Sequence, residues 1–192
     1  MSMPAHGGMS GSASAESSEQ DRDVRLAALE AEVARLRDHQ EVCRVIASYG
    51  PLVDTTSTAQ QAAQLACLWH EDGIYDIGAV GAMQGREAIA EVFAERHFDM
   101  VPSGVCHVMG LPHVRIDGDR AIALNYSCVF RPDGEERFYA WRVSANRWEL
   151  RRVAGICRID RRTNRLMNGD PDARALLDDI DGPIATETRD QQ

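Results

Sequence analysis

The spacing of apolar residues changes once along this chain, at Pro102-Ser103-Gly104. Before that point apolar residues recur every three or four positions, which is the spacing of amphipathic helices. After it they alternate with polar residues, which is the spacing of half-buried strands. Helices followed by a run of strands are typical of a domain in which the helices cover one face of an antiparallel sheet. We therefore predict the α+β fold class.

An additional helix is expected before this domain. Leu26, Leu29, Val33 and Leu36 follow a 3-4-3 spacing with charged residues between them, so a helix with a narrow apolar seam is predicted to begin near Asp21. The seam is too short for a free-standing coiled coil. We expect it to pack on a neighbouring subunit or on its own domain.

The helical pattern then continues to Val53 across Gly50-Pro51. Because proline lacks an amide hydrogen, we expect it to kink the helix or end it near Tyr49. Thr55-Thr56-Ser57 offers cap residues for a second helix, and a third helix is predicted over residues 86–98.

A short hairpin, four long strands and a final helix complete the pattern. The strands are expected at residues 105–116, 121–130, 138–150 and 156–166, and the helix at residues 172–180. The resulting organisation is a disordered segment 1–20, a helical extension 21–40, one α+β domain 41–180 and a flexible tail 181–192.

The charge balance argues against a nucleic-acid partner. The chain has 30 acidic against 21 basic residues, a formal net charge of −9, and would repel a phosphate backbone. Arginines between Arg147 and Arg165 form a local basic stretch, but strand alternation divides them between two faces of the sheet.

The cysteines and the apolar runs indicate the compartment. The five cysteines are scattered and none has C-x-x-C spacing, so neither a disulfide framework nor a zinc site is predicted. No apolar run approaches the roughly 18 residues of a membrane span. The Gly/Ser/Ala-rich N-terminus lacks the features of a signal peptide. We expect a cytoplasmic protein that does not associate with membranes.

Several local strings, in this order of elements, resemble one family. They are Tyr49–Asp54, Leu68–Asp76, Gly85–Ile89, His107, Ile116–Ala121 and Arg161–Leu166. Residues 40–178 resemble the SnoaL-like branch of the nuclear transport factor 2-like superfamily, and most of all its scytalone dehydratase, bile-acid dehydratase and hexachlorocyclohexane dehydrochlorinase group. The resemblance implies a cone-shaped α+β barrel, in which helices pack into a strongly curved, mainly antiparallel sheet.

The resemblance also implies an eliminating enzyme that needs no cofactor. The family histidine corresponds to His107 and the family aspartate to Asp54. The tyrosine of the bile-acid enzymes corresponds to Tyr49, and Arg161 is the nearest candidate for the arginine of the dehydrochlorinases.

These residue types suit proton abstraction from carbon. An imidazole is the side chain best suited to act as a base near neutrality, and a carboxylate on its other nitrogen fixes the tautomer. His107 is therefore expected to be the base and Asp54 its orienting partner. Tyr49 could donate a hydrogen bond to a developing oxyanion, and Arg161 could stabilise a departing anion.

Simpler interpretations exist for each residue. His107 could be a packed core histidine, and Asp54 could cap the second helix. In a regular strand Arg161 shares a face with Ile159, whereas Arg162 lies on the other face.

A metal site is a further alternative for His107. An even spacing places His107 and His113 on one face of a regular strand, where they could bind a metal. Gly110 and Pro112 are expected to break that register. No metal site is predicted.

We expect a lyase or isomerase that acts on a hydrophobic, cyclic small molecule, and a homo-oligomer, either a dimer or a trimer. The alternatives are a non-catalytic small-molecule binding or assembly protein, and the small subunit of a ring-hydroxylating oxygenase. An enzyme should have His107 hydrogen-bonded to Asp54 at the base of an open pocket. A binding protein should have them apart, or the pocket filled by side chains.

Overall fold

The computed structural model describes residues 11–134, 136–178 and 180–182, with side chains described from residue 18 onward. Its elements are α1 (Gly11–Asp54), α2 (Ala59–Ala66), β1 (Trp69–Asp76), the 3-10 helix η1 (Gly78–Val80), β2 (Ala82–Gln84), α3 (Arg86–His97), β3 (Cys106–Met109), β4 (His113–Asp117), β5 (Arg120–Pro132), β6 (Phe138–Val153), β7 (Ile156–Leu166) and α4 (Pro171–Asp178). This mixture of helices and one sheet confirms the predicted α+β class.

The seven strands form one curved, mainly antiparallel sheet in the order β2-β1-β7-β6-β5-β3, and β4 also pairs with β5. Strand β1 is the exception, because it pairs with β7 in parallel. Gly110 and Pro112 divide the predicted strand 105–116 into β3 and β4, which pair with opposite ends of β5. Within the described residues the sheet does not close into a barrel.

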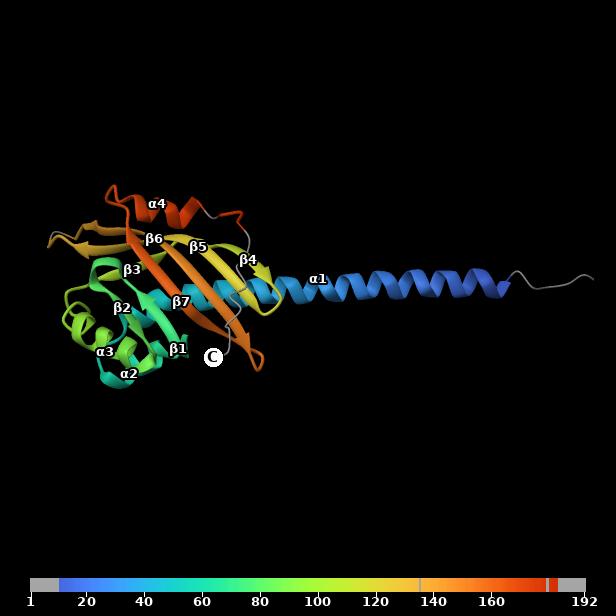
Figure 1. Cartoon of the computed structure of the whole chain (residues 1–192), viewed down its shortest axis with the longest axis horizontal. Coiled ribbons are helices and arrows are strands. Elements are labelled where there is room, and N and C mark those ends of the chain that lie inside the picture. The colour runs from blue at the N-terminus through green and yellow to red at the C-terminus, as the bar shows by residue number, and fades with distance from the viewer. Residues whose placement is uncertain (1–10, 135, 179, 183–192) are drawn as a thin grey trace, which may run out of the picture. The chain divides into compact units, whose positions relative to one another are not determined.

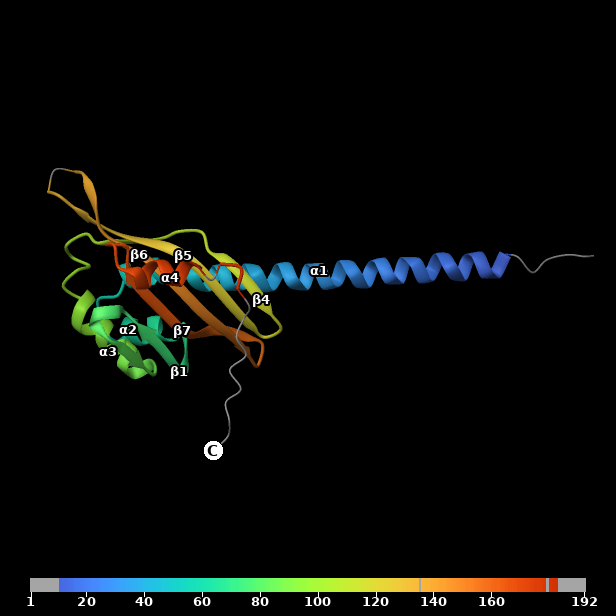
Figure 2. The same ribbon diagram turned by 45° about the horizontal axis from the view of Figure 1, so that its top comes forward.

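Three helices cover the concave face of the sheet. The C-terminal part of α1 lies along this face, and α2 and α3 lie beside each other next to β1 (Figures 1 and 2). The buried core therefore combines helix residues such as Ile46, Leu65 and Phe93 with the sheet residues Trp148 and Ile159. Helix α4 packs against β6 and β7 on the other side.

Helix α1 differs from the sequence prediction at both ends. It begins at Gly11, so residues 11–20, expected to be disordered, are helical; their alanines, serines and glutamates are compatible with a helix that the following residues extend. It also continues through Pro51 to Asp54. Residues 1–10 and 183–192, expected to be flexible, lie outside the described residues.

The cap of the second helix was also predicted at the wrong residues. The N-cap of α2 is Thr58, whose side chain accepts a hydrogen bond from the amide of Gln61. The hydroxyls of Thr55 and Thr56 instead donate to carbonyls at the end of α1. Asp54 is thus not needed as a cap.

The chain divides into two compact units, residues 1–38 and 39–192. The second unit contains the sheet and the cavity beside His107. Across the residues that the structure describes, no helix has both the length and the apolar character needed to cross a membrane.

Candidate functional site

Asp54 at the end of α1 and His107 on β3 form a hydrogen-bonded pair. The Asp54 carboxylate Oδ1 lies 2.6 Å from His107 Nδ1, and its Oδ2 accepts a hydrogen bond of 2.8 Å from the His107 backbone amide. Both residues are partly buried, with side chains 22% and 10% exposed. Two contacts to one residue fix the ring orientation. When the imidazole is neutral they hold the proton on Nδ1 and leave Nε2 unprotonated.

Gly50 permits this contact between α1 and β3. A Cβ atom built on Gly50 would collide with the backbone carbonyl oxygen of His107. Only glycine therefore lets the helix lie close enough to β3 for Asp54, one turn later, to reach His107. The Gly50-Pro51 sequence, expected to kink the helix or end it, lies where the helix comes close to the strand.

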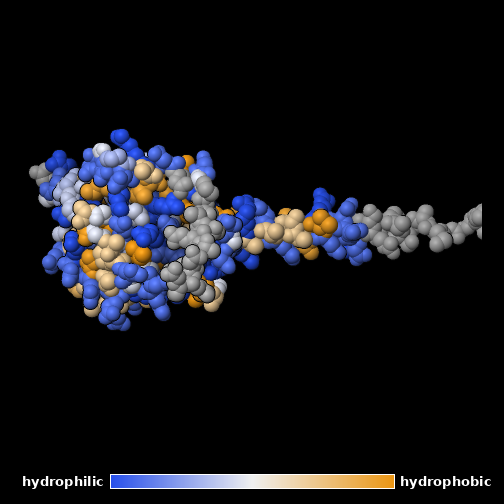
Figure 3. All heavy atoms as spheres, viewed as in Figure 1, coloured by the Kyte–Doolittle hydropathy of each residue, from blue (hydrophilic) through white to orange (hydrophobic). Residues whose placement is uncertain are grey.

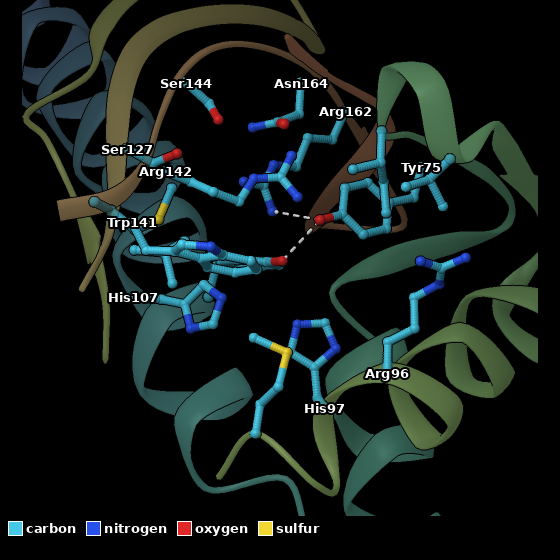
Figure 4. A pocket seen from close by; sticks show the side chains of 16 residues that line it. Tyr75, Arg96, His97, His107, Ser127, Trp141, Arg142, Ser144, Arg162 and Asn164 are labelled. Atoms are coloured by element: carbon cyan, nitrogen blue, oxygen red, sulfur yellow. Dashed lines mark hydrogen bonds between the residues drawn. The ribbon is translucent and has the colours of Figure 1, made fainter. Parts of the chain in front are cut away.

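A cavity with a volume of about 260 Å³ lies beside His107. Its lining comes from the concave face of the sheet and from α1 and α3 (Figure 4). The lining residues are Tyr49, Tyr75, Ile77, Val80, Arg96, His97, Met100, His107, Met109, Ser127, Val129, Trp141, Arg142, Ser144, Arg162 and Asn164. The cavity is therefore mixed in character, with an apolar part and a polar part.

Arg162 on β7 is the centre of the polar part. Its side chain is almost fully buried, and its Nε and Nη2 donate to Asn146 Oδ1 at 3.2 and 2.9 Å. Its guanidinium carbon lies 3.9 Å from the centre of the Tyr49 ring and 4.2 Å from that of Trp148. Asn164 donates to the same Asn146 oxygen. These contacts hold the cation rigidly at the cavity wall.

Two buried tyrosines join this arginine to the helical side of the cavity. The hydroxyls of Tyr49 and Tyr75 lie 2.9 Å apart, and Arg162 Nη1 donates to the Tyr75 hydroxyl at 3.4 Å (Figure 4). Burial raises the pKa of Tyr49 well above its ordinary range, and the cation of Arg162 opposes that shift. Tyr49 is therefore neutral, and its hydroxyl is able to donate a hydrogen bond.

Arg161, the arginine suggested by the sequence, does not line the cavity. Its Nη1 lies 4.0 Å from Asp76 Oδ2, and its side chain is 39% exposed. The cause is a β-bulge. Glu149 pairs with Arg161 and Leu150 with Ile159, so Asp160 has no partner on β6. The extra residue turns Arg162, rather than Arg161, to the same face as Ile159.

His97 is a cavity residue that the sequence reading missed. It ends α3, and its ring centre lies 5.6 Å from that of His107. Its Nδ1 is buried and has no hydrogen-bond partner within the described part of the chain. Burial lowers the pKa of His97 to about 4, and the nearby Arg162 and Arg96 cations add to that shift. Its position four residues after the buried Phe93, on the same face of α3, could have indicated that His97 points inward.

The two histidines considered as possible metal ligands, His107 and His113, do not share a strand. His113 lies exposed on β4, a different strand from that of His107. Among the described residues no group of three or more His, Cys, Asp and Glu side chains could hold a metal ion.

Solved structures share this fold. An NTF2-like protein with a cystatin-like fold from Novosphingobium aromaticivorans is 39% identical, with a TM-score of 0.73 over 79% of this chain and 96% of that one. A type 2 hexachlorocyclohexane dehydrochlorinase, LinA, is 14% identical, with a TM-score of 0.58 over 71% and 89% of the two chains. A candidate aromatic ring hydroxylase from N. aromaticivorans is 18% identical, with a TM-score of 0.56 over 69% and 90%. The last two show the fold alone.

The domain is thus an NTF2-like α+β fold with a histidine–aspartate pair beside an internal cavity. The SnoaL-like domain model matches residues 34–163, and the chain belongs to the SnoaL-like family. No curated protein matches it.

Proposed function

We propose that this protein is a lyase or isomerase that needs no cofactor, in which His107 removes a proton from a carbon atom of a small cyclic substrate. The single observation that carries the proposal is the double contact between Asp54 and His107 at the cavity. It leaves Nε2 as the basic nitrogen, and no described side chain hydrogen-bonds to it. This matches the arrangement expected of an enzyme rather than of a binding protein.

In an elimination the C–H electron pair becomes the new double bond as the leaving group departs from the adjacent carbon. The proton moves to His107 Nε2, and Asp54 stabilises the resulting imidazolium. In an isomerisation His107 returns the proton to a different carbon. Either reaction develops negative charge on an oxygen or on the leaving group.

The residues opposite His107 suit that charge. The Tyr49–Tyr75 hydroxyl pair can donate a hydrogen bond to the substrate. Arg162 donates to the Tyr75 hydroxyl, so its positive charge lies next to the pair. Because these groups are buried and already held by hydrogen bonds, they need little reorganisation when charge develops. Arg162 takes the role first expected of Arg161.

The cavity volume bears on the choice of substrate. A volume of about 260 Å³ lies just below the roughly 300–1,000 Å³ range of ligand pockets, so it suits molecules of one or two rings. Apolar residues such as Val80, Met100 and Val129 would contact the rings.

The test is turnover of a panel of one- and two-ring β-hydroxy and β-halo ketones, each with and without a carboxylate substituent, by the wild type, His107→Ala and His113→Ala. We expect His107→Ala to lower kcat/KM on an accepted substrate about 10²- to 10⁴-fold. His113→Ala, the exposed control, should leave it unchanged. Equal activity of wild type and His107→Ala would remove His107 from the mechanism.

A further inference from the structure

Three arginines line the cavity: Arg96 from α3, Arg142 from β6 and Arg162 from β7. Within the described part of the chain none of the three forms an ion pair with a carboxylate. Arginines elsewhere on the sheet do form ion pairs: Arg151 with Asp160 at 2.9 Å and Arg165 with Asp76 at 2.7 Å. The cavity therefore concentrates uncompensated positive charge in a chain whose formal net charge is −9.

Burial makes the Arg162 cation costly for the empty protein, whereas Arg142 is half-buried and Arg96 is exposed. Arg162 is 2% exposed, and its hydrogen-bond partners Asn146 and Tyr75 are neutral. A buried cation is destabilising unless a negative charge or a full set of polar contacts compensates it. Arg142 and Arg162 both point into the cavity (Figure 4).

We propose that the ligand of this cavity carries a permanent negative charge, a carboxylate or a group of similar chemistry, bound by Arg142, Arg96 and Arg162. The ring system of the ligand lies against the apolar part of the lining. Calling this anion the substrate rests on the proposed function. Binding of the anion does not require His107 to act as a base. The repulsion by Arg162 and Arg96 that helps to keep His97 neutral agrees with a positive cavity.

The probes are 2-naphthoate and its neutral amide, 2-naphthamide, titrated into the full chain by calorimetry at low and at physiological salt. We expect the carboxylate to bind at least about tenfold more tightly than the amide. Arg142→Gln and Arg96→Gln should each reduce that ratio, whereas Arg44→Gln, which removes an exposed arginine outside the cavity, should not.

Equal affinities for the two probes, no binding of either at millimolar concentration, or a ratio unchanged in both cavity variants would contradict the proposal. His107→Ala separates it from the proposed function. If that variant loses turnover and keeps the preference for naphthoate, both proposals stand. If it keeps turnover and the preference remains, only the catalytic proposal fails.

The first unit of the chain has an exposed row of apolar side chains on α1. Leu26, Leu29, Val33 and Leu36 on α1, which we call the seam, are between 44% and 63% exposed. Hydrophobic side chains are visible at the surface of this part of α1 among hydrophilic ones (Figure 3). The seam fits positions a and d of two heptads, with Leu26 and Val33 at a and Leu29 and Leu36 at d.

The charges beside the seam indicate what covers it. Arg25 and Glu32 occupy g positions, and Glu30 and Arg37 occupy e positions. In a parallel pair of helices a g residue lies near the e residue of the next heptad of the partner. Arg25 then meets Glu30 of the second copy, and Glu32 meets Arg37. All such contacts pair opposite charges, although Glu32 also binds Arg35 of its own helix at 2.6 Å.

We infer that residues 25–37 pair in parallel with the same segment of a second copy of this chain. The seam is short, but α1 is helical from Gly11 to Asp54, so pairing need not form the helix. Valine at a and leucine at d favour two strands over three.

Sedimentation equilibrium of the full chain tests this pairing. The wild type should have the mass of a dimer, and Leu29→Glu/Leu36→Glu should raise the dissociation constant at least about 100-fold. Ala27→Glu/Ala34→Glu adds the same charge at the same spacing outside the seam and should leave it unchanged. Arg25→Glu alone should weaken the dimer several-fold, and Arg25→Glu/Glu30→Arg should restore it only if the helices are parallel. A monomeric or trimeric wild type, or a dimer unaffected by the seam variant, would overturn the inference.

Discussion

Both carboxylate oxygens of Asp54 bind His107, one through the imidazole Nδ1 at 2.6 Å and one through the backbone amide at 2.8 Å. The carboxylate therefore fixes the ring with respect to its own backbone, and the pair acts as a unit. The two residues come from elements 53 positions apart in sequence, the end of α1 and the strand β3.

Asp54→Asn should separate the chemistry of the pair from its geometry. The amide keeps the shape of the side chain, but its NH2 group can donate a hydrogen bond to Nδ1, which favours the tautomer of His107 with the proton on Nε2. We expect kcat to fall about 10³- to 10⁴-fold with little change in KM. The thermal midpoint should change by only a few degrees. Steady-state kinetics and a melting curve on the same preparation check both parts, and unchanged kcat would contradict the orienting role.

Gly50→Ala should disturb the pair without touching either member. The added methyl group collides with the His107 carbonyl oxygen, so α1 must shift away from β3. Overpacking of this kind costs about 1–3 kcal/mol of unfolding free energy. We expect that loss in denaturant unfolding, together with reduced turnover. Ala47→Ser also adds one heavy atom to α1, at an exposed position, and should be neutral.

His97 should give the protein an acid-labile component of stability. Its pKa is about 4 in the folded chain, lowered mainly by burial, against an ordinary value of about 6.5. Between these values the unfolded chain binds a proton that the folded chain does not. The unfolding free energy therefore falls by about 1.4 kcal/mol per pH unit as pH decreases from 6.5 to 4.

The measurement is the difference in unfolding free energy between wild type and His97→Gln across that range. The difference cancels the carboxylates that titrate in both proteins. The wild type should become steadily less stable than His97→Gln as pH falls. His113→Gln, which removes an exposed histidine, should give a flat difference. A flat difference for His97→Gln as well would show that His97 is not held neutral by burial.

Arg162→Met should lower activity without lowering stability. The methionine fills a similar volume and removes a buried cation that forms no ion pair with a carboxylate of the described residues, so we expect an unchanged or higher thermal midpoint. Turnover should fall about 10²-fold because the Tyr49–Tyr75 pair loses the hydrogen bond and the positive charge of Arg162. Arg161→Met is the matched control and should alter neither property. A midpoint many degrees lower for Arg162→Met would mean that the cation stabilises the empty protein.

The α+β class, the order of elements and the meeting of Asp54 with His107 could be predicted from the sequence. Periodicity locates helices and strands, and the resemblance supplied the partner of His107. The bulge at Asp160 could not be predicted, because a regular alternation of faces gives no sign of one extra residue. That bulge decides which of two adjacent arginines lines the cavity.

The helix end that Gly50-Pro51 suggested does not occur, for a related reason. Local propensity favours a break at this dipeptide, but tertiary packing of α1 against β3 requires a position without a side chain. His97 was missed because its neighbour in the cavity, His107, lies on a different element, β3, and only packing brings the two rings together.

The tautomer of His107 tests the central claim most directly, because it needs no substrate. Long-range proton–nitrogen correlation spectra of the ¹⁵N-labelled protein, recorded at a pH where imidazole is neutral and assigned with His107→Gln, identify which ring nitrogen carries the proton. A proton on Nδ1 and a free Nε2 are predicted. In Asp54→Ala this preference should disappear. A wild-type ring protonated on Nε2, with Nδ1 free, would contradict the assignment of His107 as a base oriented by Asp54.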